Sequence, residues 1–399
     1  MLTAHVHHDL KIAPNRDELA RQSFATGLRV HVLNHMADRM KQHYENAVEP
    51  AFKRTHGRPP ADGQDVHKAM KPEAYFRFYS GLRVNAQEMV WASVRPTVER
   101  ALPGLRQTAA HLSADQQRAH GSVTTDEAVA VPDHVSAMDV HLMPGCYHLE
   151  ADADDIAAGV LYDNGLSVFS MGLMGDNLDD IGSSITAFIH ARYPDFKPAR
   201  ILDMGCTIGH NTLPWARTYP EAEVTGVDIS APCVRYAHAR AQSQGVTAHF
   251  RQADATATGL EDASVDLVFS SMLLHELPKK QIADVFREAR RVLKPGGLML
   301  HMELPPNNQM SAYEGFYLDW DCFYNQEPYY KGYRDQDPRQ LCADAGFDPD
   351  GYVQFVVPSI GVYGADAVRA AVDTQDTVDD ETTGRLAEGI RWFVYGAWA

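Results

Sequence analysis

The sequence predicts an α/β protein built on a doubly wound sheet, and three features of its second half indicate this fold. Residues 200–216 read as a short buried strand that ends at Asp203 and turns through glycine directly into a helix. A second apolar run ends at Asp228, and a third ends near Asp254. Because ligands of such a sheet bind outside the carboxyl ends of its strands, we expect the three acids to converge on one crevice.

Two glycines, Gly205 and Gly209, mark the turn after the first of these strands. Glycine has no Cβ atom to hold a ligand away from the backbone, and the start of a helix offers unpaired N–H groups. The spacing differs from the Gly-x-Gly-x-x-Gly of dinucleotide-binding proteins. The turn therefore predicts a ligand site and makes a nucleotide-dependent dehydrogenase the weaker alternative.

Length and composition predict a soluble protein of two or three cooperating units. The chain has 399 residues, of which 45% are hydrophobic and 22% charged. A net charge of -17 without a basic cluster argues against nucleic-acid binding. The five cysteines contain no Cys-x-x-Cys pair, so we expect neither a disulfide framework nor a thiolate zinc site. No apolar leader or membrane-length apolar segment is found, which favours a cytoplasmic protein without a membrane partner.

Residues 1–120 are expected to form a mainly helical N-terminal domain that covers an acceptor or forms a dimer interface. Apolar side chains recur at helical spacing after Asn15 or Asp17, either of which could cap the helix. The Pro/Gly-rich residues 56–65 separate it from a second, aromatic helix, in which we expect a bend near Pro96.

Residues 121–175 show short apolar runs broken by proline and glycine, which predicts an irregular or β-containing connector. Tyr162 and residues 171–177 could line the entrance to the crevice. Histidines recur here and in the N-terminal helices, but their spacings match no zinc motif, so no metal is predicted. These histidines are His31, His35, His43, His134, His141 and His148.

Residues 176–399 alternate between helical and strand patterns, as a doubly wound fold requires. The chain should close with two strands that form an antiparallel pair at the sheet edge. Between these parts, residues 311–335 carry many tyrosine, phenylalanine and tryptophan side chains. We interpret this aromatic insertion as a lid over an acceptor.

Five stretches, in this order, resemble the motifs of class I S-adenosylmethionine (SAM)-dependent methyltransferases: residues 203–209, Asp228, Asp254, residues 265–277 and residues 289–303. The small-molecule branch that includes the ubiquinone and menaquinone biosynthesis C-methyltransferases is the most similar. The resemblance covers roughly the C-terminal half of the chain. It implies a seven-stranded doubly wound sheet, SAM as the cofactor, and SN2 transfer of a methyl group to an oxygen, nitrogen, sulfur or carbon atom of a small molecule.

The resemblance also implies the donor contacts. Asp203, Gly205 and Gly209 would hold the methionine part of SAM. Asp228 would accept both ribose hydroxyls, and Asp254 would bind the adenine amino edge. The full expected set is Asp203, Gly205, Cys206, Gly209, Asp228, Ile229, Asp254, Ala255 and Ser270.

For catalysis, alignment and desolvation could supply most of the rate. His275 is the preferred general base, because imidazole can accept a proton near neutral pH; a helix-capping role is the alternative. Tyr317 and Tyr329 of the aromatic insertion are expected beside the acceptor. Two further hypotheses stay open: a SAM-binding scaffold or partner subunit that lacks catalysis, and a homodimer.

Overall fold

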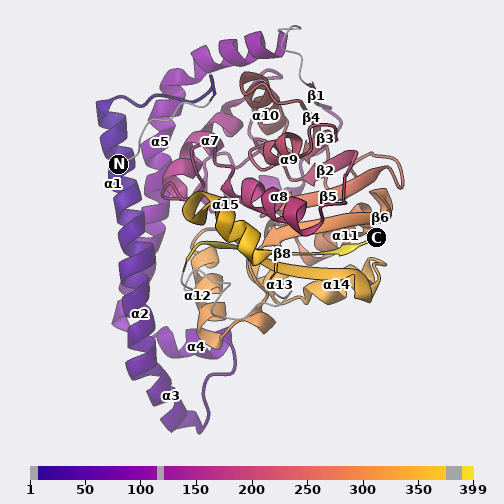
Figure 1. Cartoon of the computed structure of the whole chain (residues 1–399). Helices are drawn as coiled ribbons and strands as arrows, with labels where there is room; N and C mark the ends of the chain where they lie inside the picture. Colours follow the sequence, from indigo (N-terminus) through magenta and orange to yellow (C-terminus); the bar gives the residue numbers. More distant parts are fainter. Residues whose placement is uncertain (1–7, 115–120, 374–388) are drawn as a thin grey trace.

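The computed structural model of the chain describes residues 8–114, 121–373 and 389–399 (Figure 1). Its centre is an eight-stranded sheet with the strand order β1-β4-β3-β2-β5-β6-β8-β7. The strands are β1 (Gly121–Thr124), β2 (Arg200–Met204), β3 (Glu223–Asp228), β4 (Ala248–Gln252), β5 (Val265–Ser271), β6 (Leu293–Glu303), β7 (Tyr352–Pro358) and β8 (Arg391–Trp398).

Strands β1 to β6 pair in parallel, whereas β8 runs antiparallel to both of its neighbours, β6 and β7. This arrangement confirms the doubly wound sheet and its antiparallel closing pair. The sheet has one strand more than the seven expected, because β1 adds to the edge beside β4. At this edge Gly121 lies against Ala248, where a Cβ atom would fall 1.8 Å from the Ala248 carbonyl oxygen.

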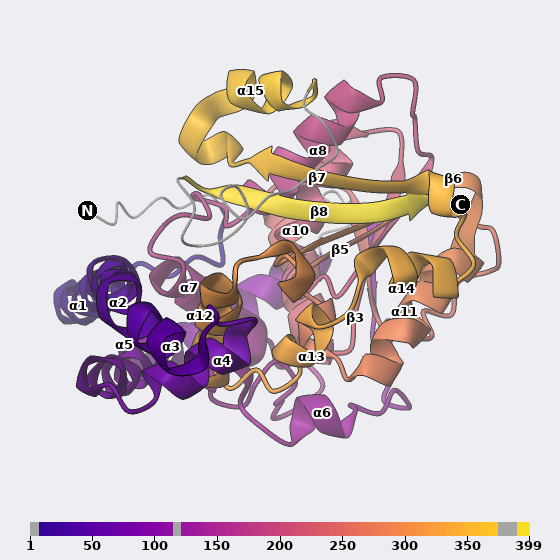
Figure 2. The same cartoon turned by 90° about the horizontal axis from the view of Figure 1, so that it is seen from below.

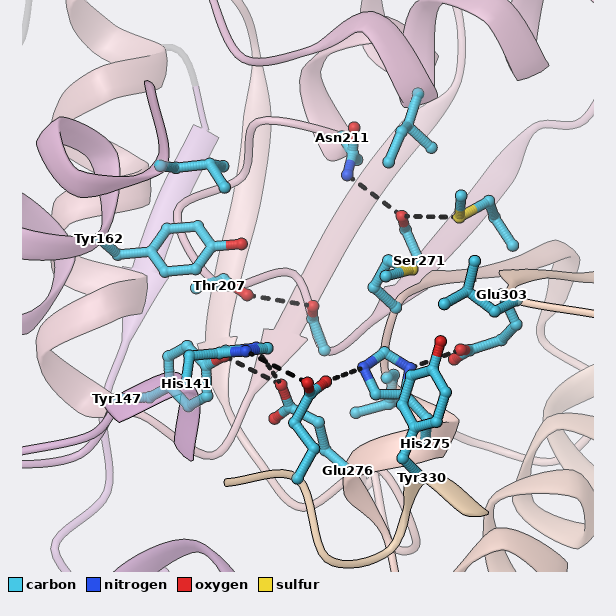
Figure 3. Close-up of a pocket in the computed structure, with 18 of the residues that line it drawn as sticks. His141, Tyr147, Tyr162, Thr207, Asn211, Ser271, His275, Glu276, Glu303 and Tyr330 are labelled. Carbon is cyan, nitrogen blue, oxygen red and sulfur yellow. Dashed lines mark hydrogen bonds and ion pairs between the residues drawn. The ribbon is translucent and has the colours of Figure 1, made fainter. Parts of the chain in front are cut away.

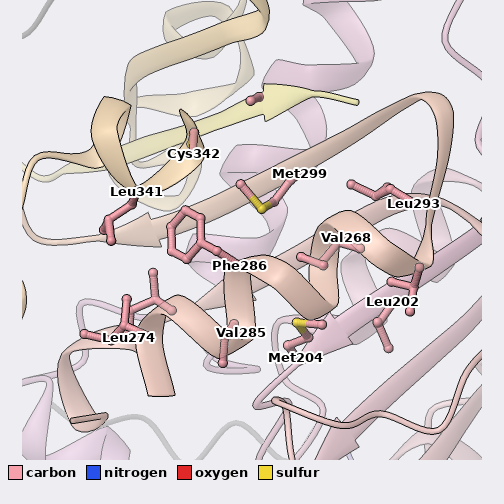
Figure 4. Close-up of a cluster of buried hydrophobic side chains, with 14 of the residues drawn as sticks. Leu202, Met204, Val268, Leu274, Val285, Phe286, Leu293, Met299, Leu341 and Cys342 are labelled. Atoms are coloured by element: carbon pink, nitrogen blue, oxygen red, sulfur yellow. The ribbon is translucent and has the colours of Figure 1, made fainter. Parts of the chain in front are cut away.

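Helices cover both faces of the sheet because the side chains of each buried strand alternate between two cores. On one face, Leu202 and Met204 of β2 pack with α11 (Lys279–Val292) and α14 (Pro338–Asp344), as Figure 4 shows for this cluster. On the other face, Ile201 packs with a different set of helices. These are α8 (Asp180–Arg192), α9 (Thr212–Thr218) and α15 (Ile360–Ala371).

The N-terminal helices form a long arm along one side of the sheet domain (Figures 1 and 2). One limb consists of α1 (Arg16–Val30), α2 (Ala37–His43) and α3 (Glu49–His56), joined by two π-helical turns. Asn15 caps α1 in a capping box with Glu18, as expected for one of the two candidate caps.

The other limb of the arm is α5 (Ala74–Ala114), which packs along α1. The helix continues through Pro96 and Pro103. Val94 and Val98, on either side of Pro96, are buried in the core that α5 shares with α1 and the connector. This packing holds the helix together where the proline removes a backbone hydrogen bond.

The connector is more regular than its sequence predicts. Residues Ala157–Phe169 form the helix α7, which packs against α5 and α10 (Ala231–Ser243). Its glycines allow close packing: a Cβ atom would lie 2.5 Å from Tyr236 at Gly159 and 2.2 Å from the Trp91 ring at Gly165. These two glycines are therefore contact points between helices.

The aromatic insertion is also different from the expected lid. Its first half forms α12 (Ala312–Phe323), which packs against α4 (Gly63–Met70) and α5 in a core shared with the N-terminal arm. Tyr317 is buried there, with its hydroxyl 3.3 Å from that of Tyr79. Only the second half, from Asn325 to α13 (Tyr330–Arg334), reaches the cavity described below. The insertion therefore serves mainly to join the two halves of the chain.

Candidate active site

A cavity of about 400 Å³ lies outside the carboxyl ends of the parallel strands (Figure 3). Three acids line it: Asp203 near the end of β2, Asp228 at the end of β3, and Asp254 just after β4. The rest of the wall comes from the connector, α7, the segment after β5, the end of β6 and the second half of the aromatic insertion. The structure thus brings the three strand-end acids to one crevice.

Asp203 is the most deeply buried of these acids, with only 1% of its surface exposed. The Thr212 hydroxyl donates to its Oδ2 atom over 2.5 Å. Burial raises the pKa of Asp203 to about 7, although the Thr212 hydrogen bond acts in the opposite direction. A cationic or hydrogen-bond-donating ligand group beside Asp203 would favour its ionised form.

Asp228 shapes the glycine turn from the neighbouring strand. Its two oxygens accept backbone N–H groups of Thr207 over 2.8 Å and Ser230 over 2.9 Å. Burial nevertheless raises the pKa of Asp228 to about 6. Each carboxylate oxygen has a second lone-pair site, so Asp228 can still accept from two ligand hydroxyls.

Most of the other residues predicted to bind the donor line the cavity. Cys206, Ile229 and Ala255 line the cavity together with Gly205. Asp254 lies at the wall as well, where its Oδ1 accepts the Thr256 backbone N–H over 2.7 Å and closes a tight turn.

Gly209 and Ser270 do not line the cavity. A Cβ atom on Gly209 would lie 2.8 Å from the Phe250 ring, so this glycine permits packing behind the turn. Ser270 is buried and its Oγ lies 2.7 Å from Nδ1 of His301, inside the sheet. Since side chains alternate along a strand, the cavity is lined by the next residue, Ser271.

His275 is held between two carboxylates (Figure 3). Its Nδ1 lies 2.6 Å from Glu303 Oε2, and its Nε2 lies 3.5 Å from Glu327 Oε1. Burial alone would lower the pKa of His275, but the charge and hydrogen bond of Glu303, together with Glu327 and Glu276, raise it to about 9. His275 is therefore a cation at neutral pH, which argues against its predicted role as the general base.

A second hydrogen-bonded group lies beside it and centres on Glu276. The Oε1 atom of Glu276 is 3.1 Å from His141 Nε2, and it accepts the Tyr147 hydroxyl over 2.9 Å. The other ring nitrogen of His141 lies 2.8 Å from the side-chain nitrogen of Asn325. Burial would raise the pKa of Glu276, yet hydrogen bonding and charge from His141 lower it, so Glu276 is ionised at neutral pH.

The predicted catalytic tyrosines lie outside the cavity wall. Tyr317 is in the core of the N-terminal arm, which corrects its assignment to the site. Tyr329 contacts the ring of His134, with 6.1 Å between the ring centroids, and His134 in turn lines the cavity. The adjacent Tyr330, not singled out from the sequence for the site, is the tyrosine of this segment that reaches the wall.

The cavity fits the SAM donor that the sequence resemblance implies. Beside the glycine turn, His210 is buried, and its Nδ1 has no hydrogen-bond partner among the described residues. Burial lowers the pKa of His210 to about 3, so the ring is neutral and its nitrogens are available to a ligand. A buried polar atom without a partner is costly, and a polar ligand at this turn would satisfy it.

Most of the cavity residues that were missed come from segments far apart in the sequence. Glu303 ends β6, Glu327 and Asn325 follow α12, and Tyr147 belongs to the connector. No local pattern marks these positions, because only the fold brings them together. Tyr162 and part of residues 171–177 do line the wall, as expected for the entrance to the crevice.

Among residues 8–114, 121–373 and 389–399, no set of three His, Cys, Asp or Glu side chains is arranged to hold a metal ion. No helix within the same ranges combines the length and apolarity needed to cross a membrane.

Comparison with known proteins connects this cavity to one domain family. Residues 201–297 match the family described as "Methyltransferase domain". The chain is 33% identical over 109 residues to a demethylmenaquinone methyltransferase of Thermus thermophilus and 37% identical over 117 residues to a trans-aconitate 2-methyltransferase of Methylobacterium nodulans. The matches cover 27% and 29% of this chain, and 49% and 42% of those relatives. The chain thus spans half or less of their length.

Two solved structures resemble the chain more loosely. A candidate O-methyltransferase of Nostoc punctiforme is 14% identical with a TM-score of 0.44, over 94% of this chain and 99% of that one. A phosphoethanolamine N-methyltransferase of Haemonchus contortus in complex with SAM is 19% identical with a TM-score of 0.37, over 57% of this chain and 55% of that one. At these scores neither structure supports an inference about activity.

Proposed function

We propose that this chain, which carries a methyltransferase domain in a doubly wound α/β fold, is a SAM-dependent methyltransferase that acts on a small molecule. The observation that supports this most strongly is the convergence of Asp203, Asp228 and Asp254 on the cavity beside the glycine turn. The turn provides bare backbone, and the three carboxylates provide the acceptors that a cationic amino acid, a ribose and an adenine require.

Each part of the wall has a proposed role. Asp203 and the turn at Gly205 would hold the methionine part, Asp228 the ribose hydroxyls, and Asp254 the adenine amino group. When bound, SAM supplies a methyl group that is already activated on a sulfonium. The chain's own task is then to align an acceptor opposite the sulfur and to exclude water.

Replacing Asp228 by alanine is expected to weaken binding of S-adenosylhomocysteine by about 1 to 3 kcal/mol, because ligand hydroxyls and two backbone N–H groups would lose their acceptor. Isothermal titration calorimetry measures this difference. Asp195→Ala, at an exposed position outside the cavity, is the matched control and should bind as the wild type does. An unchanged affinity in the Asp228 variant would refute the proposed donor site.

Donor binding should also depend on pH. Asp228 has a pKa near 6 in the ligand-free protein, but it must be ionised to accept both ribose hydroxyls. Below this pKa the ligand therefore has to displace a proton, and affinity should rise about fivefold from pH 5 to 6 and level off above about pH 7. Titrations in buffers of different ionisation enthalpy should detect the released proton. A constant affinity from pH 5 to 7 would contradict the assignment.

The location and the assembly of the protein are also part of the proposal. A reducing compartment such as the cytoplasm is supported by the five cysteines, all of which are buried and free. A homodimer through the N-terminal arm is supported by its exposed Phe24 and Phe78 side chains. Light scattering of the full-length chain after size-exclusion chromatography tests the assembly.

A further inference from the structure

We infer that the acceptor is an amine with an apolar body, whose nitrogen is received by Glu276 and Asn325. The inference rests on the proposed methyl transfer and deepens it by naming the attacking atom. It is drawn from the unused hydrogen-bonding capacity at the cavity wall, from the balance of charge around it, and from the direction in which charge moves during the reaction.

Glu276 presents a preformed acceptor to the cavity. Its Oε1 is fixed by His141 and Tyr147, whereas no described residue pairs with its Oε2. The side chain keeps 20% of its surface exposed although it lies within the wall of the cavity. A ligand N–H group can therefore bind Oε2 without breaking an existing bond.

Asn325 supplies a second, independent acceptor. The residue lines the cavity and is 1% exposed. Its side-chain nitrogen donates to Glu327 and to His141, so the amide orientation is fixed. Its Oδ1 is buried and has no partner among the described residues. Such an oxygen is costly to leave unsatisfied, and only a hydrogen-bond donor can satisfy it.

The charges around this wall favour a cation. Six carboxylates line the cavity: Asp203, Asp228, Asp254, Glu276, Glu303 and Glu327. The first three are proposed to bind the donor. The other three face the imidazolium of His275 and the ring of His141, so at least one negative charge is left over on the acceptor side even when both rings are protonated.

The remaining polar groups of the wall do not reverse this balance. Burial lowers the pKa of His134, which keeps that ring neutral at neutral pH. Arg29 is engaged by the Phe169 carbonyl and Gln87, and Arg391 is exposed at the start of β8. Glu276 is paired with His141 and Tyr147 rather than with either arginine.

The course of methyl transfer explains why an excess of carboxylates favours nitrogen as the attacking atom. An amine bound as an ammonium ion first gives up one proton to the solvent that reaches the cavity. The lone pair of the resulting neutral amine then forms the new N–CH3 bond while the S–CH3 bond breaks and its electrons stay on sulfur. S-adenosylhomocysteine leaves as a neutral thioether, and the positive charge moves to the methylated nitrogen, with no proton lost in this step. Carboxylates beside that nitrogen stabilise the charge as it develops. The same carboxylates would repel a phenolate, an enolate or a carboxylate nucleophile.

The rest of the cavity suits an apolar body. Its walls include the aromatic and aliphatic side chains of Trp91, Leu166, Phe169, Met171, Met174 and Leu273. Methionine and aromatic side chains adapt to ligands of varied outline and gain from apolar contact. An arylalkyl amine combines such a body with a terminal nitrogen.

The test uses the full chain and a matched set of probes. Phenethylamine and tryptamine are compared with 2-phenylethanol and 3-phenylpropionate, both for binding in the presence of S-adenosylhomocysteine and for release of S-adenosylhomocysteine from SAM. We expect the amines to bind at least about tenfold more tightly than the alcohol and the acid, and to be the probes that turn over.

Variants test whether Glu276 is the group that binds the amine. Glu276→Gln keeps the shape of the side chain and should weaken amine binding about tenfold while S-adenosylhomocysteine binding stays within about twofold. Glu221→Gln, at an exposed position outside the cavity, is the matched control and should change neither affinity.

Several outcomes would overturn the inference: turnover of the alcohol or acid probe without the amines, equal binding of all four probes, or a Glu276 variant that loses donor affinity instead of amine affinity. The comparison of the four probes on the wild-type protein tests the inference even if the Glu276 variant does not fold. If the wild-type protein bound neither SAM nor S-adenosylhomocysteine, the proposed function itself would fail, so the two failures are distinguishable.

Discussion

Replacing Arg83 by methionine is expected to lower the free energy of unfolding by about 3 to 5 kcal/mol. Arg83 Nε lies 2.5 Å from Asp321 Oδ1, and the two side chains are 1% and 0% exposed. The substitution would remove the Arg83 charge from beside the buried Asp321 carboxylate, which costs far more than an ion pair contributes at the surface. Urea denaturation followed by circular dichroism measures the change.

Two controls separate charge burial from the loss of packing. Arg83→Met combined with Asp321→Leu should recover most of the lost stability, because both charges of the buried pair are then replaced. Arg95→Met removes an ion pair with Glu99 whose side chains are 60% and 59% exposed, and it should cost less than about 1 kcal/mol. A loss below 1 kcal/mol in the Arg83 variant would contradict the expectation.

This pair also shows why the N-terminal arm was hard to place from the sequence. Arg83 is on α5 and Asp321 on α12, so the contact joins residues that are distant in the sequence. The aromatic side chains of α12 carry hydroxyl tips and predicted a lid, but Tyr317 directs its hydroxyl to Tyr79 of α5. The sequence pattern identifies the apolar face of a helix, but it does not identify the segment that packs against that face.

The sheet, by contrast, was predictable because its signal is local. Ile201 and Leu202 are adjacent, apolar and buried on opposite faces, and Asp203 follows them near the carboxyl end of the strand. The same pattern recurs at Asp228 and close to Asp254, which is why the donor side of the cavity could be predicted. Strand β1 could not, since it has only four residues and alternates between intermediate and exposed positions.

The differences between the predicted and the observed surroundings of site residues have physical causes as well. Ser270 and Ser271 both lie at the end of β5. Because side chains alternate along a strand, Ser271 faces the cavity, whereas Ser270 faces His301 inside the sheet. His275 was expected to be a base because an isolated imidazole titrates near neutral pH. Its two carboxylate neighbours, Glu303 and Glu327, come from other segments and change its charge state.

The charge state of His275 leads to the second large effect, a loss of stability at high pH. Its pKa is about 9 in the folded protein, against an ordinary value of 6.5. Because the folded state raises this pKa, the stabilisation is complete below pH 6.5 and is lost as the pH rises through about 9. The shift corresponds to roughly 3 kcal/mol. The gap in unfolding free energy between wild type and His275→Gln should therefore shrink by about that amount from pH 6.5 to 9.5.

The pairing with Glu303 provides the internal control. In a Glu303→Gln background the carboxylate that contributes most to the raised pKa of His275 is absent, so the same His275→Gln comparison should show a much smaller dependence on pH. Denaturant titrations of the four proteins at each pH measure both gaps. A gap that stays constant with pH in the wild-type background would mean that His275 is neutral, and a role as the general base would again be open. A gap that closes only when Glu303 is present would instead establish His275 as a fixed cation, whose charge is balanced by the carboxylates that surround the acceptor.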